Sequence, residues 1–278
     1  MKKIQLLPNV ITAFGLLCGL FVIFKLSLTP LNTVTPELLT QTAGILLLAA
    51  LADLLDGAVA RVMKAESEFG GLFDSMADAI TFGVAPTIIV LKTLSLSPDN
   101  QLAFWVLAAA LIFSISGVLR LVRYNVSSQL AKIDPALMLS NNKHFTGLPI
   151  PASAAALVSL NLFLTSQDRQ ALFDLSFETQ AAILAIAMFL LGYFMVSRWK
   201  FPSLKTLHIR VASFRVVFLT VLAAVLILFG ILHHFAAVFF AFSWAYLVIA
   251  WVIAIIRKIA GRKSKTLEEF EPDPEDDE

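Results

Sequence analysis

The chain alternates between apolar runs of about 20 residues and shorter polar stretches. An α-helix needs about that many apolar residues to cross the hydrocarbon core of a bilayer. A helix also satisfies its own backbone hydrogen bonds, as a lipid environment requires. The pattern therefore predicts an all-α fold, a polytopic transmembrane helical bundle of about eight spans, at residues 9–27, 38–62, 71–92, 102–122, 150–166, 179–197, 213–232 and 236–256.

Composition supports a membrane protein. Of the 278 residues, 58% are hydrophobic and 15% are charged, and the mean hydropathy is +0.83. A soluble domain is usually about half apolar and about a quarter charged. The formal net charge of +1 says nothing about partners, because the charges are distributed very unevenly along the chain. We expect no nucleic-acid partner.

The distribution of charge along the chain predicts its orientation. If the N-terminus is cytoplasmic, 18 of the 21 Lys and Arg residues fall in cytoplasmic segments, and only Lys25, Lys92 and Arg169 lie on the opposite side. Cytoplasmic loops typically carry such an excess of positive charge. We therefore expect a multi-pass protein of the cell inner (cytoplasmic) membrane with both termini in the cytoplasm. Three regions follow: a juxtamembrane N-terminus (1–8), a transmembrane domain (9–257) and a basic, then acidic, disordered tail (258–278).

Only four acidic residues lie within the predicted spans, and all belong to one helical hairpin: Asp53, Asp56, Asp74 and Asp78. Residues three or four apart share a helix face. Each pair therefore lies on one face of its own span. The short connection between the two spans predicts antiparallel neighbours. If the two faces oppose each other, four carboxylates converge just inside the cytoplasmic end of the membrane.

Clustered carboxylates at this depth predict a metal site. Burial and mutual repulsion oppose their charge unless cations are bound. Oxygen ligands suit Mg²⁺ or Mn²⁺, and two such ions about 3.5–4 Å apart are a common device for displacement at phosphorus. We expect two ions held by the four aspartates. Two alternatives stay open: the acids pair with arginines to hold helices together, or they mark the ion path of a cation-coupled transporter.

Small and basic residues beside the aspartates favour a phosphate-bearing substrate. Gly57 and Ala60 have no large side chain, so a bulky group can approach the backbone of the second span. Gly70 allows the same approach at the start of the third span. Arg61 adds a guanidinium that can bind a phosphate through two parallel hydrogen bonds. A transporter would give these residues no role.

The same positions form a signature that resembles the CDP-alcohol phosphotransferase family. The spacing is Asp-x2-Asp-Gly-x2-Ala-Arg-x8-Gly-x3-Asp-x3-Asp, and the chain matches it throughout, with Asp53, Asp56, Gly57, Ala60, Arg61, Gly70, Asp74 and Asp78. The resemblance implies transfer of a phosphoryl-alcohol group from a CDP-linked donor to an acceptor hydroxyl, with release of CMP. It also implies a homodimer.

The family resemblance implies roles for these residues as well. Asp53, Asp56 and Asp74 are expected metal ligands. Asp78 is expected to close the metal site and to act as the catalytic general base on the acceptor hydroxyl. The residues expected to hold the CDP moiety are Gly57, Ala60, Arg61 and Gly70.

Four further segments resemble those of bacterial membrane-embedded phosphatidylserine synthases: LPNVIT (7–12), DSMADAITFGVAP (74–86), LRLVRYN (119–125) and FTGLPIPA (145–152). They extend the resemblance over roughly the first 160 residues. We expect the catalytic core at about residues 38–165. This resemblance implies transfer of a phosphatidyl group from CDP-diacylglycerol to the hydroxyl of L-serine, the CDP-diacylglycerol–serine O-phosphatidyltransferase reaction. The same chemistry with glycerol 3-phosphate, inositol phosphate or choline as the acceptor stays open.

Five polar residues outside the signature are further candidates. Arg120 and Arg123 lie three apart at the end of the fourth span and are candidate ligands of the serine carboxylate or of a phosphate, with Asn125 adding a hydrogen bond. Alternatively, the two arginines are anchors that reach the lipid headgroups. Asn9 and Thr12, three apart in the first span, are candidate CDP or acceptor contacts, or else ordinary helix caps.

Overall fold

The computed structural model describes residues 6–30, 33–65, 67–96, 101–133, 145–167, 175–197, 200–201 and 234–268. Helices make up most of these ranges. In chain order the elements are α1 (Leu6–Leu28), α2 (Pro36–Val62), α3 (Glu68–Asp78), the π-helix η2 (Ala79–Val84), α4 (Ala85–Leu94), α5 (Gln101–Ile133), β1 (Phe145–Thr146), α7 (Ile150–Thr165), α9 (Phe177–Val196), β2 (Lys200–Phe201) and α11 (Phe235–Glu268).

Six stretches of the described chain are long and apolar enough to cross a membrane: Leu6–Leu28, Pro36–Val62, Glu68–Leu94, Gln101–Ser127, Phe177–Val196 and Phe235–Ile253. The all-helical membrane bundle predicted from the hydrophobic pattern is thus confirmed. The span expected at 150–166 appears as the shorter apolar helix α7. The span expected at 213–232 and the tail beyond residue 268 lie outside the described residues, so the count of eight stays a prediction.

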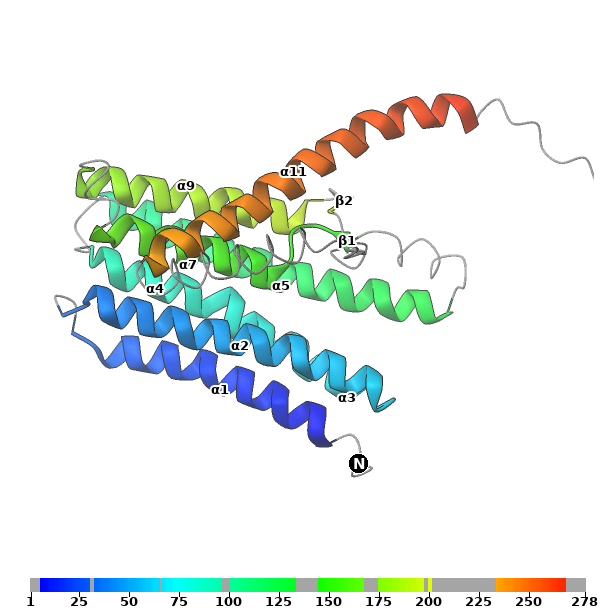
Figure 1. Cartoon of the computed structure of the whole chain (residues 1–278), viewed down its shortest axis with the longest axis horizontal. Helices are drawn as coiled ribbons and strands as arrows, with labels where there is room; N and C mark the ends of the chain where they lie inside the picture. The colour runs from blue at the N-terminus through cyan, green and yellow to red at the C-terminus, as the bar shows by residue number, and fades with distance from the viewer. Residues whose placement is uncertain are drawn as a thin grey trace, which may run out of the picture.

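Most helices run along one common direction, with α1 and α2 side by side on one flank and α9 on the other, whereas α11 crosses them obliquely and packs on α7 (Figure 1). Helix α7 lies between the flanks and contacts α2, α4, α9 and α11. Eleven of its 16 residues are buried. At 1.5 Å per residue it is about 24 Å long, shorter than the roughly 30 Å hydrocarbon core. Because protein surrounds α7, it does not have to match the thickness of the bilayer.

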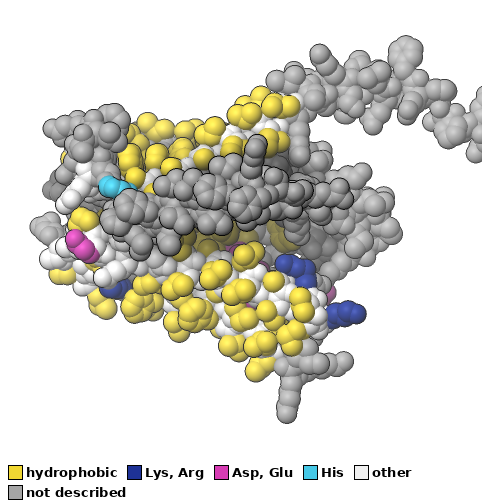
Figure 2. Space-filling model, viewed as in Figure 1, with side chains coloured by type: hydrophobic (Ala, Val, Ile, Leu, Met, Phe, Trp, Pro, Cys, Tyr) yellow, Lys and Arg dark blue, Asp and Glu magenta, His cyan; other side chains and the backbone are white. Residues whose placement is uncertain are grey.

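The outer surface of α1 and α2 is apolar, as a lipid-facing surface must be. Its exposed side chains include Phe14, Leu17, Phe21, Leu48 and Leu51. Hydrophobic side chains cover this flank in Figure 2, and basic side chains lie toward its ends. Both features are typical of a helix bundle embedded in a bilayer.

The third span changes from α-helix to π-helix at the residue after Asp78. Pro86, in the first turn of α4, lacks the amide hydrogen that would bond to the Phe82 carbonyl in a regular α-helix. The hydroxyl of Ser114 on α5 donates a hydrogen bond of 2.9 Å to the neighbouring Gly83 carbonyl. The widened turn is thereby tied to α5 immediately after the last aspartate of the signature.

Two short strands hold the start of α7 against the end of α9. β1 and β2 pair antiparallel, with Phe145 opposite Phe201. The Leu148 amide then donates to the Phe194 carbonyl at 3.1 Å. Between these contacts Gly147 adopts a positive φ of 83°, which favours glycine because it has no side chain to clash.

Candidate active site

The hairpin between α2 and α3 positions the four aspartates. α2 ends at Val62 and α3 begins at Glu68, where the hydroxyl of Ser67 caps the helix by accepting a 3.0 Å hydrogen bond from the Gly70 amide. The direct contact between α2 and α3 is slight, whereas α1 packs against both. The two helices run antiparallel, as expected (Figure 1). Helix α1 bridges them, and a cavity lies between their aspartate-bearing faces.

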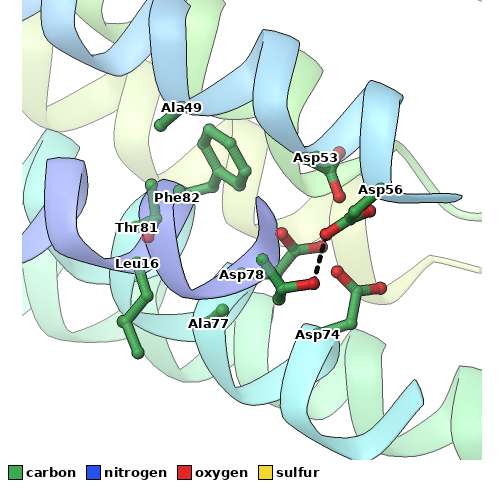
Figure 3. Close-up of a pocket in the computed structure, with 11 residues that line it drawn as sticks. Leu16, Ala49, Asp53, Asp56, Asp74, Ala77, Asp78, Thr81 and Phe82 are labelled. Carbon is green, nitrogen blue, oxygen red and sulfur yellow. Dashed lines mark hydrogen bonds between the residues drawn. The ribbon is translucent and has the colours of Figure 1, made fainter. Parts of the chain in front are cut away.

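All four carboxylates lie in this cavity. Asp53 and Asp56 project from α2 toward Asp74 and Asp78 of the third span (Figure 3). Carboxylate oxygens of Asp53, Asp56 and Asp74 lie within 4.8 Å of one another. The cavity is also lined by Thr12, Gly15, Leu16, Ala49, Ala77, Thr81 and Phe82. The convergence expected from helical periodicity is thus present in the structure.

Helix α1 supplies polar contacts to the cavity. The buried Thr12 hydroxyl donates a 2.5 Å hydrogen bond to Asp56 Oδ2 and also lies 3.1 Å from the Pro8 carbonyl oxygen. Asn9 lies one turn away and packs on Gly70, because a Cβ at Gly70 would be only 3.1 Å from Asn9 Oδ1. Asn9 Nδ2 is buried and has no hydrogen-bond partner in the described part of the chain. Both α1 residues proposed from sequence therefore lie at or beside the aspartate site.

Glycines of α1 allow this close approach. A Cβ at Gly15 would lie 3.6 Å from the Ala49 carbonyl oxygen on α2. A Cβ at Gly19 would lie only 2.9 Å from Thr81 Cα. Small residues at helix contacts of membrane bundles let backbones approach in this way.

The remaining signature residues lie beside the cavity rather than in its lining. The guanidinium of Arg61 folds back toward Gly57, where an added Cβ would be 3.4 Å from its terminal nitrogen. Arg61 itself is exposed, whereas Gly57, Ala60 and Gly70 are half-buried. An exposed guanidinium beside a bare helix surface leaves room for a phosphate-bearing group at the rim. The contact of Gly57, Ala60, Arg61 and Gly70 with CDP stays a prediction.

The three candidates on α5 have different surroundings. Arg120 is half-buried within electrostatic range of Asp78, and its Nε has no hydrogen-bond partner among the described residues. Arg123 donates to the Val196 carbonyl at 2.7 Å, at the C-terminal end of α9. Asn125 Nδ2 donates to the Ser75 hydroxyl at 3.0 Å. Arg120 therefore approaches the aspartates, whereas Arg123 and Asn125 tie α5 to α9 and to α3.

Sequence reasoning did not identify the inner wall of the cavity. Thr81 and Phe82 belong to η2 and Leu16 belongs to α1, and all three line the cavity beyond the aspartates (Figure 3). The Thr81 hydroxyl is buried without a hydrogen-bond partner in the described structure. Its position three residues after Asp78 was an available signal, because it continues the same helix face.

The donor set fits a hard divalent cation. Three carboxylates from two helices surround one point, and every candidate ligand atom is an oxygen. Mg²⁺ and Mn²⁺ are the divalent ions that such carboxylate sites suit. The hydrogen bond from the Thr12 hydroxyl fixes the orientation of the Asp56 carboxylate. Hydrogen-bonding neighbours of metal ligands commonly have this role.

Comparisons with known proteins agree with this site. The family model described as CDP-alcohol phosphatidyltransferase matches residues 5–199. The chain is 30% identical to the CDP-diacylglycerol–serine O-phosphatidyltransferase of Helicobacter pylori over 265 residues, which is 95% of this chain and 98% of that protein. It is 32% identical over 199 residues to the Bacillus subtilis protein of the same name, covering 72% of this chain and 91% of that one.

A third relative carries the same name. The Methanocaldococcus jannaschii protein of the same name is 32% identical over 177 residues, covering 63% of this chain and 71% of that protein. The family match covers well over half of the chain and includes α1, the aspartate hairpin, α5 and α7. The chain therefore belongs to the CDP-alcohol phosphatidyltransferase family.

Proposed function

We propose that this membrane phosphatidyltransferase moves a phosphatidyl group from CDP-diacylglycerol to the hydroxyl of L-serine, giving phosphatidylserine and CMP. The observation that carries the proposal is the convergence of four carboxylates from α2 and the third span on one cavity. Relatives named for this reaction, similar over as much as 95% of the chain, support serine as the acceptor.

Asp53, Asp56 and Asp74 are the residues that would hold Mg²⁺ or Mn²⁺, because their oxygens lie within 4.8 Å of one another. Asp78 lines the same cavity and would close the site, which has enough carboxylates for two ions. When bound, the metal supplies positive charge that polarises the diphosphate and stabilises the departing CMP. Exposed Arg61, beside Gly57, would bind a donor phosphate at the rim of the cavity. Asn9, Ala60 and Gly70 would contact the CDP moiety on the same side.

Asp78 is the proposed general base. It accepts the proton of the serine hydroxyl while the serine oxygen forms a bond to the phosphorus that carries the diacylglycerol. The bond from that phosphorus to the CMP oxygen breaks, and CMP leaves with the electron pair. Direct displacement needs no other reactant.

Arg120 is the proposed ligand of the serine carboxylate. It lies within electrostatic range of Asp78, and its Nε has no hydrogen-bond partner among the described residues, so one substrate can contact both side chains. Arg123 is less suited to this role, because its guanidinium already donates to the Val196 carbonyl. Asn125 supports the site indirectly, through Ser75, the residue after Asp74.

The asymmetric distribution of basic residues supports an active site facing the cytoplasm in the inner membrane. CDP-diacylglycerol then approaches from the cytoplasmic leaflet, with its nucleotide toward the aqueous side. The family resemblance supports a homodimer as the assembled form.

The test is CMP release by the purified full-length protein in detergent, with CDP-diacylglycerol and either Mg²⁺ or Mn²⁺. Serine, glycerol 3-phosphate, inositol phosphate, choline and no acceptor are compared. Release that requires both metal and serine is the expected result, and Asp78→Asn is expected to abolish it. Release with a different acceptor overturns serine specificity. Failure of a folded, metal-loaded protein to release CMP with any acceptor, together with metal-driven substrate flux in vesicles, supports the transporter instead.

A further inference from the structure

Helix α11 lies beyond the part of the chain that the family model matches, which ends at residue 199. Two tryptophans anchor α11 on the bundle. The indole nitrogen of Trp244 donates a 3.2 Å hydrogen bond to the Ala156 carbonyl on α7. The ring of Trp251 lies 4.8 Å from the ring of Phe194 on α9. Tyr246 lies between the two tryptophans in the sequence, so the same contacts fix its depth in the bundle.

Tyr246 differs from the other two tyrosines of the chain. Tyr124 and Tyr193 are 54% and 62% exposed. Tyr246 is half-buried and packs against the main hydrophobic core. The hydroxyl of a buried tyrosine usually has a hydrogen-bond partner. A polar partner is therefore expected on the side of α11 that faces the bundle.

The polar side chain that Tyr246 approaches is Arg120 of α5. The two lie within electrostatic range of each other. Arg123 and Trp251 both contact the C-terminal end of α9, and α5 and α11 both run toward that end of the bundle (Figure 1). Arg120 precedes Arg123 by three residues and Tyr246 precedes Trp251 by five. Both therefore lie about 5–8 Å deeper, at 1.5 Å per residue.

The tyrosine and the arginine do not bond to each other. No hydrogen bond joins them in the part of the chain that the structure describes, and Arg120 Nε has no partner there. A guanidinium and a phenol hydroxyl can both donate hydrogen bonds, and a carboxylate has two oxygens that accept them. A carboxylate bound at Arg120 can therefore accept a second hydrogen bond from Tyr246.

We propose that Tyr246 determines acceptor specificity, because its hydroxyl donates a hydrogen bond to the acceptor carboxylate that Arg120 holds. The proposal rests on the proposed function, which places serine beside Arg120. Choline has no carboxylate and cannot accept this bond. Helix α11 thereby takes part in selecting the acceptor, although the aspartate signature lies wholly in α2 and the third span.

The test is Tyr246→Phe, which removes only the hydroxyl. The KM for serine in metal-activated CMP release is expected to rise about tenfold, as for the loss of a hydrogen bond to a charged group. The KM for CDP-diacylglycerol is expected to stay unchanged. Tyr193→Phe is the matched control, because it removes the same atom from an exposed tyrosine. Both KM values of the control are expected to equal those of the unaltered protein.

An unchanged KM for serine in Tyr246→Phe overturns the proposal. An equal rise in both KM values also overturns it, because Tyr246 would then support only the packing of α11. If the unaltered protein releases no CMP with serine, the proposed function fails instead, and the two failures are thus distinguished.

A second measurement needs neither turnover nor a variant of Tyr246. The full-length protein is labelled with 3-fluorotyrosine, and the fluorine resonances of its three tyrosines are followed by nuclear magnetic resonance. Tyr124→Phe and Tyr193→Phe assign them. Serine added to the Mg²⁺-loaded protein with CMP is expected to shift the Tyr246 resonance, and choline is not. A Tyr246 resonance that serine leaves unchanged, or that choline shifts equally, overturns the proposal.

Discussion

The Thr12 hydroxyl donates a hydrogen bond to a carboxylate oxygen of Asp56, a residue 44 positions later in the chain. Both side chains are buried where α1 packs on α2. A carboxylate that accepts such a bond is held in one orientation. The first helix, which carries none of the acidic residues, therefore helps to build the candidate metal site.

Replacing Thr12 with valine removes the donor and keeps the shape. The metal concentration that gives half-maximal CMP release is expected to rise about tenfold, because partners of metal ligands typically contribute that much to affinity. Thr12→Ser keeps the hydroxyl and is expected to remain close to the unaltered protein. An unchanged metal midpoint in Thr12→Val would show that Asp56 does not need this contact.

Asp74→Asn and Asp78→Asn are expected to differ in metal binding although both abolish turnover. Asp74 contributes to the group of oxygens within 4.8 Å, whereas Asp78 lies outside that group. Direct Mn²⁺ titration, followed by electron paramagnetic resonance, is expected to show at least about a tenfold loss of affinity for Asp74→Asn and a much smaller loss for Asp78→Asn. Equal losses would place Asp78 among the primary ligands and remove the reason to assign it a separate role.

Arg120→Gln is expected to raise the KM for serine about tenfold or more, because a charge-assisted hydrogen bond contributes roughly 1.5–3 kcal/mol. The KM for CDP-diacylglycerol is expected to change little. Initial rates measured against each substrate separately check this. If both KM values rise equally, Arg120 supports the whole site rather than binding serine.

Arg123→Gln is expected to act on stability instead. It loses the 2.7 Å bond to the Val196 carbonyl at the end of α9, a loss of about 1.5–3 kcal/mol. Thermal unfolding in detergent is expected to shift down by several degrees, while the KM for serine stays near that of the unaltered protein. A selective rise in that KM with unchanged stability would assign Arg123 to the acceptor site.

Gly19→Ala is expected to destabilise the protein and lower its activity. The new Cβ would lie 2.9 Å from Thr81 Cα, so α1 must move away from η2, beside Asp78. Overpacking of this kind costs about 1–3 kcal/mol. Gly44→Ala is the matched control, because its Cβ would meet nothing within 4 Å. Comparable melting temperatures and turnover for the two variants would show that the contact is not tight in the folded protein.

Local patterns were sufficient to predict the helices and the aspartate pairs. Hydrophobic runs predicted the six spans because a helix in lipid is stabilised by its own backbone bonds and its own apolar side chains. Helical periodicity placed Asp53 with Asp56 and Asp74 with Asp78, because neighbours three or four apart lie on one face. The short connection between the helices then predicted antiparallel neighbours, in which the two pairs meet if their faces oppose each other.

Tertiary packing decided the rest. The contacts from Thr12 to Asp56 and from Arg123 to the end of α9 join residues 44 and 73 positions apart, and no periodicity relates such pairs. The same packing encloses α7, so that a helix of 16 residues suffices. The sequence by itself determined which helices form and which carboxylates share a face, because both are local properties; only the packing of distant helices decided which partners orient those carboxylates and what adjoins them.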